Sequence, residues 1–224
     1  MTTTIRARAV LLDMDGTLVD STAVVERLWL QWAKPHGIDP ERVLSVVHGR
    51  QGHQSMAILL PERDHAINLL ENQQMLERET GDVEGVVAIG GAQRLLEALQ
   101  PHPHAIVTSA DVALMTARMD AAGLTVPALA VTAESVTASK PHPEGFLKAA
   151  ASLQVDPADC VVFEDSPAGI EAGLAAGMVV IGVGPHAAAN APTHAVADLT
   201  HVSIVGTDDG FEITVDESEA VTRG

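Results

Sequence analysis

Short apolar runs rich in β-branched residues recur along the chain and alternate with stretches of helical periodicity. We expect strands in these runs, which lie at Ala7–Asp13, Val86–Ile89, Ala105–Thr108, Cys160–Phe163 and Met178–Ile181. The helical stretches between them are Ala92–Gln100, Val112–Ala122, Pro143–Ser152 and Ala168–Ala176. Strands joined by helical crossovers predict an α/β fold, a Rossmann-like parallel sheet with helices on both faces.

The region from Ser21 to Gly85 has a different pattern, which is helical and interrupted by turn residues. Its first apolar stripe ends at Pro35 and Gly37 and consists of Val24, Val25, Leu28, Trp29 and Trp32. Pro40 and Pro61 stand where first helical turns would begin. We therefore predict a helical cap over residues 19–86, inserted into a core domain of residues 1–18 and 87–224.

The end of the chain predicts a third type of structure, a C-terminal β-hairpin. Val202–Val205 and Phe211–Val215 flank Asp208, Asp209 and Gly210, a turn signal between two apolar runs. The polar residues from Asp216 to Gly224 are expected to be loose.

Composition narrows the possible functions. Of 224 residues, 46% are apolar, enough for a substantial core, but aromatic residues make up 2%, too few for the stacking surfaces of single-stranded nucleic acid binders. The net charge of −17 argues against nucleic acid and anionic membranes. The lone Cys160 excludes an internal disulfide. No apolar run approaches the length of a membrane span, so we expect a cytoplasmic protein.

The most informative motif is Asp-Met-Asp-Gly-Thr at residues 13–17, directly behind the first apolar run. Side chains alternate along a strand, so Asp13 and Asp15 are expected to point the same way. Two carboxylates this close stay ionised together when a cation or fixed donors lie between them. The alternative at this point is a strand end followed by a solvated acidic turn.

Two further motifs follow at later positions. Thr108 and Ser109 end a predicted strand and could offer donors to an anion, although Ser109 or Asp111 could instead cap the next helix. Lys140 lies at the entrance to a predicted helix, in a segment stiffened by prolines, and is one of three lysines in the chain. A lone lysine is usually solvated.

The fourth motif is Glu164-Asp165, which ends another buried run and precedes the turn residues Pro167 and Gly169. These acids could simply favour a helix N-terminus. Together with Asp13 and Asp15, however, they form an oxygen-rich set at the carboxyl edge of a parallel sheet, which suits Mg²⁺.

In order and spacing, the four motifs resemble those of the haloacid dehalogenase-like hydrolase superfamily, and the resemblance covers the whole chain. It is strongest toward the capped sugar-phosphatase and β-phosphoglucomutase-like branch, which includes hexose- and glycerol-phosphate phosphatases. The residues 48–51, His-Gly-Arg-Gln, in the predicted cap support this branch. The resemblance implies a Mg²⁺-dependent phosphatase that hydrolyses sugar or polyol phosphates and has a small phosphate ester as its partner.

The resemblance also implies roles for individual residues. Asp13 would attack phosphorus and form an aspartyl phosphate, and Asp15 would transfer protons. The metal would be held by the Asp13 carboxylate, the Asp15 main-chain carbonyl and Asp165, with Glu164 behind them and its direct ligation left open. The phosphoryl group would be bound by Thr108, Ser109 and Lys140, and the cap would contribute Arg50.

Other functions of this superfamily and a non-catalytic role fit the motifs less well. Dehalogenases and phosphonate-cleaving enzymes of the superfamily lack the second aspartate, so Asp15 argues against both. A sugar phosphomutase shares both aspartates, but Thr22–Leu28 lacks the cap histidine of related mutases, while Arg50 matches one of their arginines. A non-catalytic binding protein would be expected to have lost some of these carboxylates.

Overall fold

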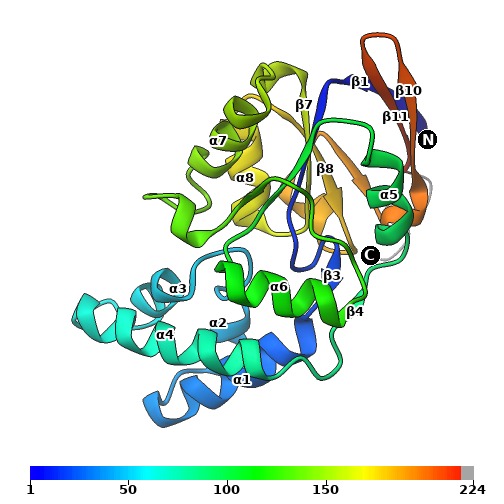
Figure 1. Cartoon of the computed structure of the whole chain (residues 1–224). Helices are drawn as coiled ribbons and strands as arrows, with labels where there is room; N and C mark the ends of the chain where they lie inside the picture. Colours follow the sequence, from blue (N-terminus) through cyan, green and yellow to red (C-terminus); the bar gives the residue numbers. More distant parts are fainter. Residues whose placement is uncertain (218–224) are drawn as a thin grey trace.

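The computed structural model describes residues 1–217 and is built around a six-stranded parallel sheet (Figure 1). In spatial order its strands are β6 (Ala130–Val131), β5 (His104–Val107), β2 (Ala9–Leu12), β7 (Cys160–Glu164), β8 (Val179–Val183) and β9 (His194–Val196). The two central strands, β2 and β7, pair in register, so that Leu12 lies opposite Phe163. Their carboxyl ends therefore meet at one edge of the sheet.

Helices cover both faces of this sheet, as the α/β pattern predicted. They are α5 (Ala92–Leu99), α6 (Val112–Ala121), α7 (Glu144–Leu153) and α8 (Pro167–Ala175). Alternate residues of β2 belong to different clusters: Val10 and Leu12 pack with α5 and α6, whereas Ala9 and Leu11 pack with α7 and α8. This alternation is the period-two consequence of burying both faces of a strand.

The N-terminal strand differs from the prediction. The expected strand Ala7–Asp13 is divided into β1 (Thr2–Ala7) and β2, with Arg8 between them. β1 pairs with β11 (Gly210–Asp216), which pairs with β10 (Val202–Thr207), in an antiparallel sheet of order β1-β11-β10. The predicted C-terminal hairpin is thus confirmed, and it gains a third strand.

The tail prediction is corrected in one respect. Asp216 belongs to β11 rather than to a loose tail, because it pairs with Thr2. Glu217 is held as well, because its N–H donates to the Met1 carbonyl at 2.9 Å and its Oε1 lies 3.0 Å from His194 Nδ1. Residues 218–224 of the expected tail lie outside the described residues.

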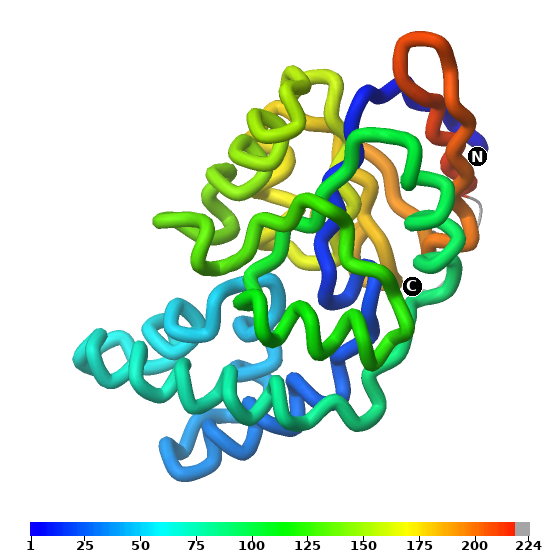
Figure 2. The backbone as a smooth tube through the Cα atoms, viewed as in Figure 1, coloured from blue at the N-terminus to red at the C-terminus, as the bar shows by residue number. Residues whose placement is uncertain are grey.

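Most of the chain between β2 and α5 is helical, and these helices form a separate layer beside the carboxyl edge of the sheet (Figures 1 and 2). They are α1 (Thr22–Ala33), α2 (Pro40–Leu44), α3 (Gly52–Leu59) and α4 (His65–Gly81). The chain enters through β3 (Val19–Asp20) and leaves through β4 (Val87–Ala88). We call residues 22–81 the helical segment. The division into a core and a cap at residues 19–86 stays a prediction.

The expected strand Val86–Ile89 is present in part, as β4, but it does not belong to the parallel sheet. It pairs antiparallel with β3 in a two-stranded ladder. The prediction from the strand–helix alternation was wrong here. The two segments that connect the sheet to the helical segment, β3 and β4, lie side by side and pair with each other.

Five short 3₁₀ helices complete the described elements, at Lys34–His36, Ala133–Ser135, Pro157–Asp159, Ala187–Asn190 and Leu199–His201. Across residues 1–217, none of the helices combines the length and the apolar character needed to cross a membrane.

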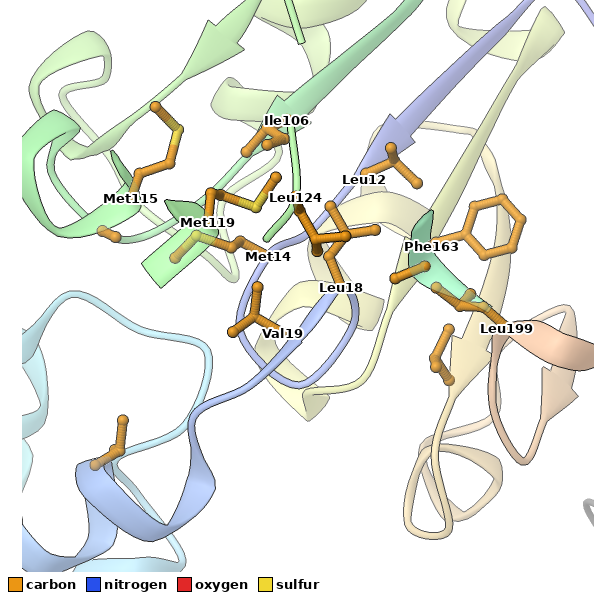
Figure 3. Close-up of a cluster of buried hydrophobic side chains, with 14 of the residues drawn as sticks. Leu12, Met14, Leu18, Val19, Ile106, Met115, Met119, Leu124, Phe163 and Leu199 are labelled. Carbon is orange, nitrogen blue, oxygen red and sulfur yellow. The ribbon is translucent and has the colours of Figure 1, made fainter. Parts of the chain in front are cut away.

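The core beneath the carboxyl edge of the sheet combines aliphatic side chains with several methionines and with Phe163 (Figure 3). Met14, between the two aspartates, is fully buried in this cluster with Leu18 and with Met119 of α6. Because Met14 points into the core, Asp13 and Asp15 are left on the other side of the chain.

Candidate active site

The acidic residues of the first and fourth motifs meet at the ends of β2 and β7. Asp13 follows β2, its main-chain N–H donates to the Phe163 carbonyl at 3.0 Å, and Glu164 ends β7. Lys140, in the loop before α7, donates from Nζ to Asp13 Oδ1 at 2.5 Å and to Glu164 Oε1 at 2.6 Å. Asp13, Lys140 and Glu164 are all buried. Lys140 is therefore not a solvated surface lysine but forms a buried bridge between two acids.

Burial dominates the electrostatics of this cluster. It raises the pKa of Asp13 to about 8, since the effect of desolvation and of neighbouring Glu164 and Asp15 exceeds that of Lys140, which lowers it. Burial, Glu164 and Asp13 also raise the pKa of Asp165. Burial lowers the pKa of Lys140, but the carboxylates of Asp13 and Glu164 outweigh it and raise that pKa. One ammonium thus faces three carboxyl groups.

A divalent cation fits this cluster. Carboxyl oxygens of Asp13, Glu164 and Asp165 lie within 4.8 Å of one another. Asp165 Oδ1 is buried and, within residues 1–217, has no hydrogen-bond partner. Hard cations such as Mg²⁺ prefer such oxygen ligands. Gly16 lies against this carboxylate with φ of +84°, and a Cβ there would come within 2.0 Å of Asp165 Oδ2.

Glu164 differs from the other two acids because both of its oxygens already accept hydrogen bonds. Lys140 donates to Oε1, and the N–H and hydroxyl of Ser166 donate to Oε2 at 2.8 and 3.0 Å. Gly169 leaves room for it, since a Cβ there would lie 1.6 Å from Oε1. Glu164 is thus placed to orient Lys140.

Asp15 lies on the same side of the chain as Asp13, but its carboxylate has different partners. Ser21 Oγ donates to Oδ1 at 2.7 Å, and Arg118 Nη1 donates to Oδ2 at 2.7 Å. Its side chain is 29% exposed. Each of the two aspartates thus has a cation of its own, Lys140 for Asp13 and Arg118 for Asp15.

Thr108 and Ser109 follow β5, the neighbour of β2, and both line the cavity that contains Asp13 and Asp15. The Thr108 hydroxyl accepts from the Ala110 N–H at 3.1 Å. The Ser109 hydroxyl donates to the Gly49 carbonyl at 3.1 Å and so connects the sheet to the helical segment. The helix cap suggested as an alternative exists too, because Asp111 accepts from the Leu114 N–H.

Arg50 lies in the loop between α2 and α3 and lines the same cavity. Within residues 1–217 its guanidinium has no hydrogen-bond or ion-pair partner. Of the neighbouring polar residues, Gln51 donates to the Ala133 carbonyl and Gln54 of α3 accepts from the Ser139 hydroxyl, so both connect the helical segment to the segment between β6 and α7. Arg50 is the cation of this loop that faces the cavity unpaired.

Sequence reasoning missed Arg118 and Glu79. Arg118 is 3% exposed, and its Nη2 donates to Glu79 Oε2 at 3.0 Å. Each charge lies on the buried stripe of an amphipathic helix: Arg118 follows Leu114 and Met115 in α6, and Glu79 follows Met75 in α4. A charge at a core-facing helical position was the signal that could have identified them.

Comparison with known proteins agrees with this arrangement. The haloacid dehalogenase-like hydrolase family matches residues 7–177. The chain belongs to this family. Because the match includes all four motifs, it also covers every candidate catalytic residue described above.

Two relatives of established name are similar over most of their length. Hexitol phosphatase A of Escherichia coli K12 is 42% identical, over 87% of this chain and 90% of its own. 2-deoxyglucose-6-phosphate phosphatase 2 of Saccharomyces cerevisiae is 30% identical, over 87% and 89%. These relatives and the family confirm the prediction of a hydrolase of the phosphoric monoester type.

A solved structure supports the fold. The β-phosphoglucomutase of Clostridium difficile superposes with a TM-score of 0.72 and 21% identity, over 86% of this chain and 92% of that one. This superposition shows the fold alone, and the predicted sugar-phosphatase branch is confirmed by the family match together with the related phosphatases.

Proposed function

We propose that this chain is a Mg²⁺-dependent phosphatase that hydrolyses sugar or polyol phosphates through an aspartyl phosphate. The observation that carries the proposal is the buried bridge of Lys140 between Asp13 and Glu164, beside an oxygen of Asp165 that has no hydrogen-bond partner in the described part of the chain. Such a site places a nucleophilic carboxylate, a phosphate-binding ammonium and ligands for a cation within one small volume.

In the first half-reaction, Asp13 forms a bond to phosphorus while the bond to the ester oxygen breaks. Asp15, in its protonated form, gives its proton to the departing alcohol. Lys140, Thr108 and Ser109 bind the oxygens of the phosphoryl group as it moves between the two. In the second half-reaction, Asp15 takes a proton from water, which attacks phosphorus and releases Asp13 and inorganic phosphate.

Mg²⁺ would be held by the Asp13 carboxylate, the Asp15 main-chain carbonyl and Asp165. When bound, the ion supplies charge neutralisation for the phosphate and for the clustered acids. Glu164 is assigned to holding Lys140 because both of its oxygens are occupied by donors.

The cavity walls support a hydroxylated substrate with an apolar side. Trp29, Met75 and Leu76 form one part of the lining, and Arg50, His48 and Asn72 form another. The related proteins named as acting on hexitol and 2-deoxyglucose phosphates favour the same class. The cytoplasmic location stays a prediction.

The first experiment is a phosphate-release screen over hexitol, hexose and glycerol phosphates, with and without Mg²⁺. We expect turnover of at least one ester with Mg²⁺, and loss of turnover after chelation that Mg²⁺ reverses. Full-rate hydrolysis without any divalent cation would contradict the metal assignment, and no hydrolysis of any ester would contradict the proposed function.

The same screen tests the mutase alternative, which Arg50 keeps open because related mutases have a cap arginine. Incubation with β-glucose 1-phosphate and catalytic β-glucose 1,6-bisphosphate should give inorganic phosphate. Accumulation of glucose 6-phosphate faster than inorganic phosphate would favour the mutase.

A further inference from the structure

One buried guanidinium connects the helical segment to Asp15. Arg118 of α6 donates through Nη1 to Asp15 and through Nη2 to Glu79, and Glu79 lies near the end of α4. The helices α4 and α6 pack against each other and lie side by side in Figure 1. Asp15, Arg118 and Glu79 all line the cavity.

We propose that Arg118 and Glu79 are positioning residues that hold the Asp15 carboxylate in place for proton transfer. Through this bridge, the packing of α4 on α6 sets the orientation of Asp15. The inference rests on the proposed function, because it takes the proton-transfer role of Asp15 from it.

The geometry fixes Asp15 from two sides. Ser21 holds one carboxylate oxygen and Arg118 holds the other, both at 2.7 Å, so rotation of the carboxylate would break at least one charge-assisted hydrogen bond. Each oxygen retains a further acceptor position, and the side chain is 29% exposed at the cavity wall. Asp15 is therefore immobilised yet accessible to a substrate oxygen.

Fold stability alone does not account for the bridge. Buried ion pairs usually add little stability, because desolvation offsets their attraction. Two unfavourable features are visible here: Arg118 Nε is buried and, among the described residues, unpartnered, and burial raises the pKa of Glu79 to about 7 despite the lowering effect of Arg118. A role at Asp15 explains why a charged residue occupies this core-facing position.

Glu79 adds a property that Arg118 alone would lack. A guanidinium bound only to Asp15 could move together with the Asp15 carboxylate. Because Arg118 also binds Glu79, its guanidinium is held on α4 as well. Since α4 belongs to the helical segment, Asp15 gains its full support when that segment lies against α6. Proton transfer is thereby coupled to the closed arrangement of the two parts.

The test compares kcat/KM for two esters, sorbitol 6-phosphate and p-nitrophenyl phosphate. An alkoxide leaving group needs a proton, whereas p-nitrophenolate leaves without one, so misplacement of the general acid selectively slows the hexitol ester. The variants are Glu79→Gln, Arg118→Lys and Arg118→Ala. The matched control is Glu77→Gln, which neutralises an exposed carboxylate on the same helix.

We expect Arg118→Ala to lower kcat/KM for sorbitol 6-phosphate about 10²-fold, the low end of the range for acid–base groups, with a much smaller loss on p-nitrophenyl phosphate. Arg118→Lys and Glu79→Gln should show the same selectivity with smaller losses, because one contact of the fork remains. Methylguanidinium should partly restore Arg118→Ala on the hexitol ester, and Glu77→Gln should behave as wild type.

Equal losses on both esters for Glu79→Gln and Arg118→Ala, with lowered melting temperatures, would assign the bridge to folding and overturn the inference. Wild-type kinetics in both variants would overturn it as well, while leaving the proposed function intact. If the wild-type chain hydrolyses neither ester, the failure belongs to the proposed function instead.

Discussion

At the scale of single residues, two aspartates separated by one residue have different surroundings. Asp13 is buried next to Lys140, whereas Asp15 is partly exposed between Ser21 and Arg118. Met14 separates them by packing into the core. Environments that differ this much allow identical carboxylates to perform different chemistry, and in the proposed function Asp13 is the nucleophile and Asp15 the proton carrier.

Substitution of each of these two aspartates should therefore remove a different step of the reaction. Asp13→Asn removes the attacking oxygen, so no phosphoenzyme should form and turnover should be lost. Asp15→Asn keeps the nucleophile but removes proton transfer, and should lower kcat for an alkyl phosphate by about 10²–10⁴-fold. The measurements are steady-state rates and acid-quench trapping of the phosphoenzyme.

A suitable control is Asp120→Asn, which changes an exposed aspartate of α6 with no assigned role. It should retain wild-type rates. Near wild-type turnover by Asp13→Asn would contradict its assignment as nucleophile.

At the scale of elements, the regular parts of the fold were predictable. The strands β5, β7 and β8 and the helices α5–α8 agree with the predicted ranges to within about two residues, because their periodicity is local. The division between β1 and β2 was not predicted, because a single apolar run supplies strands to both the antiparallel and the parallel sheet. The pairing of β3 with β4 depends on residues almost seventy positions apart.

The same distinction applies to the site. Asp13, Lys140 and Glu164 follow from motifs at strand ends, and the topology of a parallel sheet brings such ends together. Arg118 and Glu79 are single charges at core-facing positions of two helices, and the sequence does not show that they are partners. Their meaning depends on contact between α4 and α6, which no local pattern encodes.

The loop between α2 and α3 carries the next prediction. Arg50 lines the cavity and has no acidic partner within residues 1–217, so it is placed to bind the substrate. Arg50→Ala should raise KM or lower kcat/KM for the preferred sugar or polyol phosphate. p-Nitrophenyl phosphate, which offers few hydroxyl groups to recognise, should be affected less. Steady-state kinetics on both esters measures the difference.

Arg42→Ala is the matched control, because this exposed arginine of α2 does not line the cavity. Equal losses on both esters in Arg50→Ala would indicate a role in the chemistry or in folding. No loss on either would make Arg50 a solvated surface residue.

At the scale of the whole molecule, the net charge of −17 is opposite to what an anionic substrate would favour. The site compensates locally, since Lys140, Arg118 and Arg50 all line the cavities around Asp13. The acidic cluster of Asp13, Glu164 and Asp165 still has more carboxyl groups than the single ammonium of Lys140 that contacts it. Stability should therefore depend on both pH and bound metal.

The last prediction follows from the pKa values of Asp13, Asp165 and Glu79, which burial raises, to about 8 for Asp13 and about 7 for Glu79. A carboxyl with a raised pKa binds more protons in the folded chain than in the unfolded one, so the free energy of unfolding falls as pH rises through that interval, by up to about 1.4 kcal/mol per pH unit for each group. Without metal, the melting temperature should therefore be higher at about pH 5 than at about pH 8.

Bound Mg²⁺ should change this pH dependence. Because Mg²⁺ binds the ionised carboxylates, it should raise the melting temperature more at about pH 8 than at about pH 5. Asp165→Asn should lose most of this metal effect, and a metal effect that is equal at both pH values would contradict the proposed ligands.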